Sequence, residues 1–293
     1  RKHDMKVHLY ADDTQLYLAF KPDAAAAALD QMMDCIDEIR SWMEANMLKL
    51  NDSKTEFMVI GSKNTLAKIS DDIGSIRVGD ETVEAASSAR NVGAILDSHM
   101  NLEDHVNSIT KGCYHHLRNI GRIRRQLTED AAKTLVQSLV LSKIDSLNSL
   151  LYGLPDKWIR KLQLVQNTGA RIITGLGRYD HVTPALQDLH WLPIPYRIKY
   201  KICMLTFKCV HKIAPEYLCD LVETYVPKRG LRSANQGRLC EKVSIGKTYG
   251  DRAFSVCAPK LWNSLPENLR MAKSLETFKK NLKTHYFKLA YDM

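Results

Sequence analysis

Two adjacent aspartates between two short alternating stretches constrain the start of this fold more than any other sequence feature. Residues 7–10 precede the pair and residues 16–20 follow it, and both stretches have the alternation typical of half-buried strands. They predict a β-hairpin with Asp12 and Asp13 at its turn. Two negative charges this close are costly without a cation, and carboxylate oxygens suit Mg²⁺. We therefore expect either a metal-binding turn or, as the alternative, a solvated hairpin tip.

Residues 1–97 are predicted to mix strands with one long helix. Apolar residues at helical spacing favour a helix that begins with Asp23 as its N-cap and continues to Trp42 or beyond. A turn is expected at Gly79 and Asp80. Further strands are predicted at residues 56–60, 75–78, 82–85 and 91–96.

From residue 101 onward the pattern becomes helical, so the predicted fold class is α+β. Residues 225–250 are polar, basic and rich in glycine, which indicates a loop or a linker. Helices are expected at residues 102–127, 129–151, 156–174, 193–212, 252–263 and 274–289.

Basic residues are concentrated in the C-terminal two-thirds of the chain. Residues 1–100 contain 11 Lys and Arg against 17 Asp and Glu, whereas residues 101–293 contain 31 against 16. This distribution favours a polyanionic partner, most simply nucleic acid, and a solvated lysine-rich surface is the alternative. No apolar run has the length of a membrane span, so no membrane partner is expected.

The seven cysteines are scattered through the sequence and follow neither disulfide nor zinc-site spacing. We therefore expect neither a disulfide framework nor a zinc knuckle. The pattern favours a reducing, intracellular compartment.

The helix expected at residues 102–127 has one basic face and one apolar face. The apolar face consists of Val106, Ile109, Cys113, Leu117 and Ile120. The opposite face, at spacings of three and four, consists of Lys111, His115, Arg118, Arg122 and Arg125. Arginine can contact two phosphate oxygens at once, so this face suits a nucleic-acid backbone. Any surface helix also has a charged outer face, which is the alternative interpretation.

The order of motifs along the chain is more specific than the aspartate pair alone. A lysine-bearing segment at residues 48–57 and a glycine-containing segment at residues 90–97 follow the hairpin. Distinctive strings occur further on, at residues 148–155, 189–193, 249–256 and 261–266. In this order the sequence resembles the reverse transcriptases of non-LTR, LINE-like retrotransposons of the Jockey and chicken-repeat-1 kind. The resemblance covers essentially the whole chain.

This resemblance implies an RNA-directed DNA polymerase that transfers nucleotides from dNTPs to a DNA 3′-hydroxyl, with two Mg²⁺ ions and an RNA template. Residues 1–97 would be the C-terminal part of the palm, residues 98–175 a helical thumb-like region, and residues 176–293 a helical basic C-terminal region. The implied partners are an RNA template and a DNA primer or target. The implied locations are a cytoplasmic ribonucleoprotein and the nucleus.

The family also implies roles for individual residues around the metal site. Asp12 would be the main metal ligand and Asp13 its partner, with Tyr10 packed near the primer end. Lys54 would lie near the incoming triphosphate, where its ammonium group can neutralise charge or protonate the leaving pyrophosphate. The alternative for Lys54 is an ordinary lysine before a strand.

A primer grip is implied at Val92 and Gly93. Glycine allows the backbone to approach nucleic acid closely, although a plain strand glycine or a bulge is the alternative. The basic face of residues 102–127 would belong to the thumb and contact the template–primer duplex.

Polymerases of this family require a third carboxylate, which lies tens of residues before the aspartate hairpin. Only nine residues precede Tyr10 here, and position 1 is not Met. We therefore expect a C-terminal fragment that is inactive alone. Two hypotheses follow: part of a retrotransposon reverse transcriptase, or a non-catalytic nucleic-acid-binding remnant of a decayed mobile element. Oligomeric state is left open.

Overall fold

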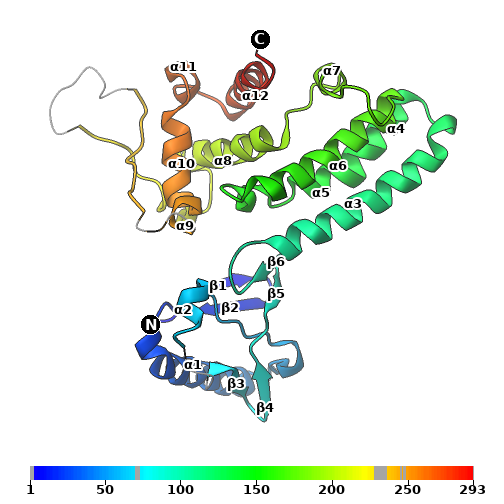
Figure 1. Ribbon diagram of the computed structural model, residues 1–293. Coiled ribbons are helices and arrows are strands. Elements are labelled where there is room, and N and C mark those ends of the chain that lie inside the picture. Colours follow the sequence, from blue (N-terminus) through cyan, green and yellow to red (C-terminus); the bar gives the residue numbers. More distant parts are fainter. Residues whose placement is uncertain (1–2, 70–72, 228–235, 245, 247–248, 293) are drawn as a thin grey trace. The chain divides into compact units, whose positions relative to one another are not determined.

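The computed structural model describes residues 3–69, 73–227, 236–244, 246 and 249–292. The chain divides into two compact units, residues 1–105 (unit 1) and residues 106–293 (unit 2). Within the described residues, the named strands lie in unit 1 as antiparallel pairs, and unit 2 is mainly helical (Figure 1). The described structure is therefore of the α+β kind, as expected.

The strands of unit 1 form hairpins between neighbours in the sequence. Their bounds are β1 (Lys6–Tyr10) with β2 (Asp13–Tyr17), β3 (Ser75–Val78) with β4 (Glu81–Glu84), and β5 (Ser88–Asn91) with β6 (Ala94–Asp97). The helical elements of unit 1 are η1 (Pro22–Ala24), α1 (Ala25–Ala45), η2 (Asp52–Lys54) and α2 (Lys63–Leu66). The predicted hairpin is confirmed, with Asp12 in its turn, whereas Asp13 is the first residue of β2 and pairs with Tyr10.

The core of unit 1 lies between α1 and the β3–β4 hairpin. Ile36 of α1 packs with Ile76 and Val78 of β3, and all three side chains are buried. Leu16 of β2 and Phe57 pack against the same cluster. The helical spacing of apolar residues in α1 thus has its predicted consequence, since one face of the helix is buried against a sheet.

Two local predictions in unit 1 are wrong. Asp23 is not the N-cap of α1, because Pro22 begins a short 3₁₀ turn that contains Asp23 and leaves Ala24 at the cap. Residues 56–60 do not form a strand. Phe57 makes an isolated bridge with Ala85, and a strand needs a hydrogen-bonded neighbour along its length.

The strand expected at residues 91–96 is also wrong, because this segment contains a turn. Asn91 ends β5, Ala94 begins β6, and the two residues pair across Val92 and Gly93. Both turn residues have positive φ, 43° at Val92 and 86° at Gly93, as a tight two-residue hairpin of this kind requires. The turn was missed because a β-branched residue rarely adopts positive φ.

Unit 2 is built from helices that follow one another along the chain. The first group is α3 (Glu103–Ile123, which begins in unit 1), η4 (Arg124–Gln126), α4 (Glu129–Val136), η5 (Gln137–Leu141), α5 (Ser142–Asp145), η6 (Asn148–Leu151) and α6 (Asp156–Thr174). The second group is α7 (Thr183–Asp188), α8 (Ile194–Val210), α9 (Glu216–Cys219), η7 (Gly250–Arg252), α10 (Phe254–Asn263), α11 (Glu267–Arg270) and α12 (Leu275–Tyr291).

The single helix predicted at residues 129–151 is interrupted in the structure. A π-helical turn, η5, follows α4, and α5 then ends before Leu147, whose φ is 57°. A residue in the left-handed region cannot continue a right-handed helix. The predictions for residues 156–174 and for the helix that begins beside Pro193 are confirmed by α6 and α8. The linker predicted at residues 225–250 lies partly outside the described residues.

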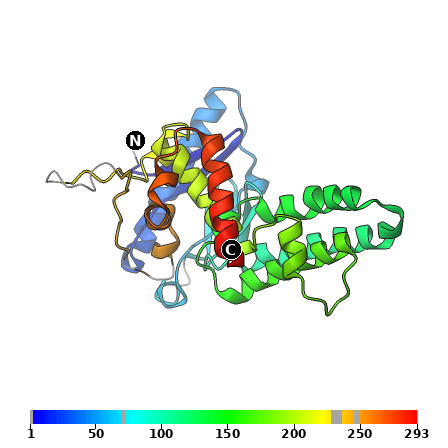
Figure 2. The same cartoon turned by 90° about the horizontal axis from the view of Figure 1, so that it is seen from above.

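Aromatic rings from three helices form one centre of the unit 2 core. Phe207 of α8 stacks on Phe278 of α12 with ring centroids 4.5 Å apart, and Trp262 of α10 lies 5.6 Å from Phe278. All three side chains are fully buried. Figure 2 shows α12 beside α8, the contact that this stacking stabilises.

Close approach of helices forms a second centre of the core. A Cβ at Gly169 of α6 would lie 2.9 Å from Val136 Cγ1 on α4 and 3.6 Å from Leu117 Cδ2 on α3. Glycine is therefore needed at this position for α6 to pack against both helices.

The turn between β6 and α3 is organised by the buried carboxylate of Asp97. Its Oδ1 accepts hydrogen bonds from the amides of His99 (3.0 Å) and Asn101 (3.1 Å), and its Oδ2 accepts one from Leu102 (2.7 Å). Met100 and Leu102 have φ of 48° and 56°, which is costly for residues other than glycine. The three hydrogen bonds stabilise this strained turn directly before α3.

We expect Asp97→Ala to lower the free energy of unfolding of unit 1 by about 2–4 kcal/mol, because three amides lose their acceptor. Urea denaturation followed by circular dichroism measures the change. Asp34→Ala, at an exposed position of α1, is the matched control and should change stability by less than about 0.5 kcal/mol. Equal effects of the two substitutions would contradict the role of Asp97.

Candidate functional site

A hydrogen bond joins the two hairpins for which the sequence predicts function. Gln15 Nε2 on β2 donates to Asn91 Oδ1 on β5 over 2.5 Å. Gln15 lies two residues after Asp13, and Asn91 directly precedes Val92. The structure thus brings the aspartate hairpin next to the hairpin that contains Val92 and Gly93, and the reader can follow both in Figure 1.

The turns of these two hairpins both contain a strained backbone. Ala11 has φ of 52° and Val92 has φ of 43°, and for a β-branched residue such a value is a genuine outlier. Val92 is 45% exposed, and Tyr10, beside the first turn, is 56% exposed. A Cβ at Gly93 would meet no atom within 4 Å, so the space around this turn is open. Strained, exposed turns of this kind are concentrated at functional sites.

Val92→Asn should raise the free energy of unfolding of unit 1 by about 0.5–1 kcal/mol, because asparagine tolerates positive φ better than valine does. Chemical denaturation provides the measurement. Val7→Asn, at an exposed position of β1, is the control and should destabilise, since asparagine is a poor strand former. A loss of stability for both variants would mean that Val92 is not strained.

Asp12 and Asp13 are both exposed at the tip of the first hairpin. Among the described residues, no group of three or more His, Cys, Asp or Glu side chains is arranged to hold a metal ion. The described residues therefore offer a cation two adjacent carboxylates rather than a complete protein cage. Hard oxygen donors of this kind suit Mg²⁺, which commonly completes its octahedron with water and phosphate oxygens.

Lys54 is exposed at the end of η2, in a segment that is anchored to α1. The anchor is an ion pair of 2.5 Å between Asp52 Oδ1 and Arg40 Nη2. Within the part of the chain that the structure describes, no hydrogen bond or ion pair joins Lys54 to Asp12 or Asp13. The role of Lys54 at the triphosphate remains a prediction.

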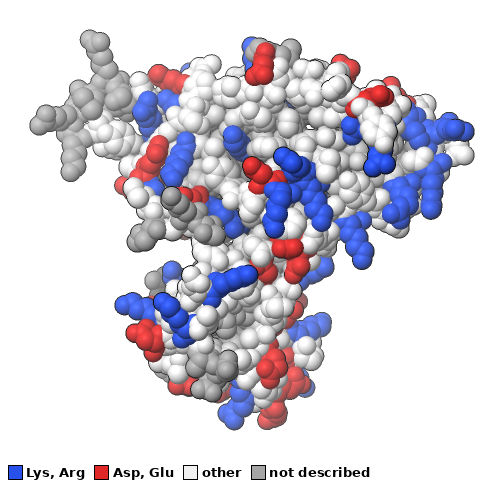
Figure 3. All heavy atoms as spheres, in the orientation of Figure 1, with Lys and Arg blue, Asp and Glu red and all other residues white. Residues whose placement is uncertain are grey.

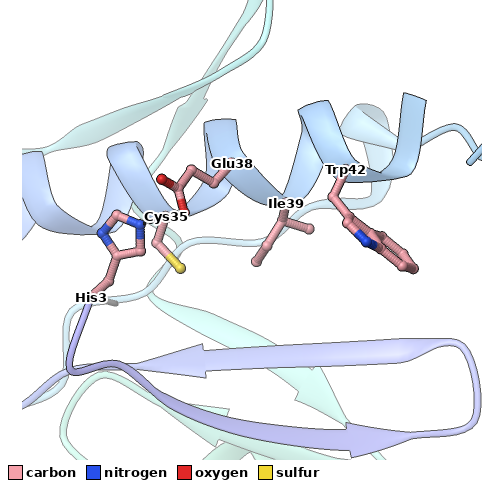
Figure 4. A pocket seen from close by; sticks show the side chains of 5 residues that line it. All are labelled: His3, Cys35, Glu38, Ile39 and Trp42. Atoms are coloured by element: carbon pink, nitrogen blue, oxygen red, sulfur yellow. Dashed lines mark ion pairs between the residues drawn. The ribbon is translucent and has the colours of Figure 1, made fainter. Parts of the chain in front are cut away.

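A small pocket of about 210 Å³ beside α1 offers no activated nucleophile. His3 Nε2 pairs with Glu38 Oε2 over 2.9 Å, and Figure 4 shows both side chains next to Cys35. Burial, and secondarily the charge of Glu38, raises the pKa of the Cys35 thiol. A thiol with a raised pKa stays protonated at neutral pH and is a poor nucleophile.

Four further buried cysteines behave in the same way. All seven cysteines of the chain are free thiols. Burial raises the pKa of Cys203 to about 12 and those of Cys113, Cys209 and Cys257 to about 11. These side chains are therefore part of the packing of unit 2 and not candidates for covalent chemistry.

The basic face predicted for residues 102–127 is exposed along α3 and η4. We call its five side chains the basic stripe: Lys111, His115, Arg118, Arg122 and Arg125. On the opposite face Val106, Cys113, Leu117 and Ile120 are buried, and Ile109 is half-buried. Residues 105–128 contain no Asp or Glu. Figure 3 shows Lys and Arg gathered over the part of unit 2 where Figure 1 places α3.

Basic residues of α6 extend this surface, and sequence analysis missed them. Lys161 Nζ donates a hydrogen bond to Asn107 Oδ1 of α3, which ties the start of α6 to the edge of the stripe. Lys157 Nζ lies 4.3 Å from the ring centroid of Trp158, which is half-buried. The sequence does contain a signal for this basic surface, since residues 157–179 contain no Asp or Glu.

Electrostatics favour the neutral form of His116 on α3. Burial, the charge of Lys143 and then His115 lower the pKa of its imidazole. The neutral ring nitrogen Nε2 lies 3.1 Å from Lys143 Nζ and can accept its hydrogen bond. Lys143 is thereby held beside α3.

Arg124 differs from its neighbours in the stripe because each nitrogen of its guanidinium donates to a backbone carbonyl. Nε and Nη2 donate to the carbonyls of Ile172 and Ile173 near the end of α6, both over 2.7 Å, and Nη1 donates to Leu127 over 2.8 Å. A cation at the C-terminal end of a helix satisfies carbonyls that lack intrahelical partners. Arg124 is therefore a structural residue.

We expect Arg124→Ala to lower the free energy of unfolding of unit 2 by about 2–4 kcal/mol through the loss of three charge-assisted hydrogen bonds. Arg122→Ala, at an exposed position two residues away, should change it by less than about 0.5 kcal/mol. Thermal and urea unfolding of the two variants measure the difference. Similar stabilities would show that the contacts of Arg124 do not stabilise the fold.

In comparisons with protein families, curated proteins and solved structures, no match to this chain was found. In the described part of the chain, no helix combines the length and apolarity that crossing a bilayer requires. Functional interpretation therefore depends on the residues of this chain and their geometry.

Proposed function

We propose that this chain is the C-terminal part of a non-LTR retrotransposon reverse transcriptase, and that unit 2 binds the template–primer duplex. The basic stripe carries the proposal, because an exposed row of basic side chains in a segment without Asp or Glu is complementary to a phosphate backbone. The order of motifs supports it, since the stripe follows a hairpin with Asp12 and Asp13 and a hairpin with Val92.

The dimensions of the stripe suit one nucleic-acid strand. At about 1.5 Å of rise per residue, the segment from Lys111 to Arg122 extends over roughly 16 Å of helix. One strand of a duplex presents a phosphate about every 3.4 Å along its axis, so the segment spans about four to five phosphates. Arginine is well suited to such contacts, because its planar guanidinium binds phosphate through two hydrogen bonds.

The hairpins of unit 1 would serve the same duplex at the primer end. In the intact polymerase Asp12 and Asp13 would each supply a carboxylate to Mg²⁺, and the proposal places the third carboxylate outside these residues. Tyr10 and the turn of Val92 and Gly93 are exposed near the hydrogen bond that joins the two hairpins, where they can contact the primer backbone. Lys54 would contribute charge at the triphosphate.

Duplex binding is tested with the triple variant Arg118→Gln, Arg122→Gln and Arg125→Gln. At about 0.1 M salt its affinity for an RNA–DNA duplex should fall at least about tenfold, and the slope of log K against log salt should fall by about 2–3. Fluorescence anisotropy with a labelled duplex, repeated across a salt series, measures both quantities. Stability should stay unchanged, because the three side chains are exposed.

The matched control carries the same charge change on another exposed surface: Lys273→Gln, Lys280→Gln and Lys288→Gln. Its affinity should stay within about threefold of the parent chain, since these lysines are not in the stripe. Equal losses of affinity in both variants would show that the effect comes from net charge alone. Salt-insensitive binding, or none, by the parent chain would overturn the proposal.

A second candidate function is nucleic-acid binding without catalysis. The exposure of Asp12 and Asp13, with no third acidic group beside them in the described residues, favours it for the chain as it stands. Primer extension with Mg²⁺, dNTPs and an RNA template separates the two functions. Extension that Asp12→Asn abolishes would establish the polymerase, whereas binding without extension would leave the non-catalytic function.

A further inference from the structure

A cavity of about 480 Å³ lies within unit 2, in a part of the structure that the basic stripe does not line. Its walls come from η5, α5, η6, the segment before α8, α8 itself and α12. The volume falls in the range of small-ligand pockets, about 300–1,000 Å³. Apolar side chains in the wall include Leu141, Leu192 and Met204.

Two buried polar side chains of this wall each have one atom without a hydrogen-bond partner, although Asn148 Nδ2 donates to Asp145 Oδ1 over 3.3 Å. Asn148 and Trp191 are 3% and 4% exposed and both line the cavity. Among the described residues, Asn148 Oδ1 and Trp191 Nε1 have no partner. Buried polar groups in native proteins are nearly always paired, so such exceptions often indicate a ligand or a bound water. Here the unpaired groups are one acceptor and one donor.

The backbone around the cavity is irregular at several points. Leu147, directly before Asn148, has φ of 57°, and His190, directly before Trp191, has φ of 54°. The π-helical turn η5 contributes Gln137 to the wall. Strained residues and π-turns are both concentrated at functional sites.

The charge of the cavity wall is positive. Arg197 is neutralised by Asp145, through a bond of 2.8 Å from Nε to Oδ1 and a second bond from Nη2 to Oδ2. Lys201 of α8 and Lys283 of α12 line the cavity, and neither has an acidic partner among the described residues. Residues 189–215 contain no Asp or Glu. The cavity therefore suits a ligand with two parts: an anionic group, and an apolar body that also carries a hydrogen-bond donor and acceptor.

We propose that this cavity takes a single unpaired nucleotide of the nucleic acid that unit 2 binds, an inference that rests on the proposed function. The Watson–Crick edge of every nucleobase offers a donor and an acceptor, which match Asn148 Oδ1 and Trp191 Nε1. The flat base fits beside the apolar wall, and the phosphate of the nucleotide pairs with Lys201 and Lys283. Unpaired bases are available to such a pocket because they are already out of the stack.

The test compares two RNA–DNA duplexes that differ by one unpaired nucleotide, a bulged and a fully paired probe, with the full chain. The parent chain should bind the bulged probe about five- to tenfold more tightly. Trp191→Phe retains the ring and removes the donor, so it should reduce this preference about three- to tenfold. The affinity for the paired probe should stay unchanged. Anisotropy measures both affinities, and the thermal midpoint reports folding.

A second variant keeps the test decisive if Trp191→Phe fails to fold. The double variant Lys201→Gln with Lys283→Gln removes two positive charges and leaves Asn148 and Trp191 in place. It should also lower the preference for the bulged probe. The control is Lys280→Gln with Lys288→Gln, which changes two charges on exposed positions of α12 that do not line the cavity. It should retain the preference.

The outcomes separate this inference from the proposed function. In the triple stripe variant both affinities should fall while their ratio persists, which supports a separate nucleotide site. Equal binding of the two probes by the parent chain overturns the nucleotide site but leaves duplex binding intact. Loss of salt-sensitive binding to both probes overturns the proposed function itself. If inorganic phosphate abolishes the preference as effectively as a mononucleotide, the cavity is an anion site only and the inference is wrong.

Discussion

The buried carboxylate of Asp97 is the interaction on which the path of the chain depends. It accepts three amide hydrogen bonds in a turn that contains two left-handed residues, and α3 begins immediately afterwards. The faces of α3 are fixed by its own spacing of apolar and basic residues. Through the Asp97 turn the chain passes directly from β6 into α3, without a linker. One acidic side chain within the proposed primer-grip segment therefore has a structural role that makes the neighbouring basic helix possible.

The arginines of α3 and η4 have different roles because they differ in their access to backbone acceptors. Arg124 lies near the end of α6, where carbonyls lack helical partners, and two nitrogens of its guanidinium donate to them. Arg118, Arg122 and Arg125 are exposed in the same segment, so their charge faces solvent and any polyanion in it. A count of basic residues in the sequence does not distinguish these roles. The distinction depends on which side chain reaches a buried acceptor, and only the folded structure supplies that information.

Periodicity predicted the parts of this fold that repeat, and failed where the backbone departs from a repeat. The aspartate hairpin, α6 and both faces of α3 follow from spacings of two or of three and four residues. The turn at Val92 and the break at Leu147 were missed, because residue type gives no signal when a bulky side chain adopts positive φ. The cavity was missed for a different reason. Asn148 and Trp191 come from distant segments of the sequence. Asn148 Oδ1 and Trp191 Nε1 become buried without a hydrogen-bond partner only when the helices pack.

Four of the residues with positive φ lie at the candidate sites, whereas Met100 and Leu102 belong to the Asp97 turn. In unit 1 the strained residues Ala11 and Val92 occupy the tips of two hairpins that a hydrogen bond joins. In unit 2 the strained residues Leu147 and His190 each precede a buried polar group without a partner, and both groups line one cavity. A sequence under selection for stability alone would replace such residues with glycine or asparagine, because each strained position costs about 1–3 kcal/mol. That these four positions lie at exposed turns and beside a cavity supports function at these places.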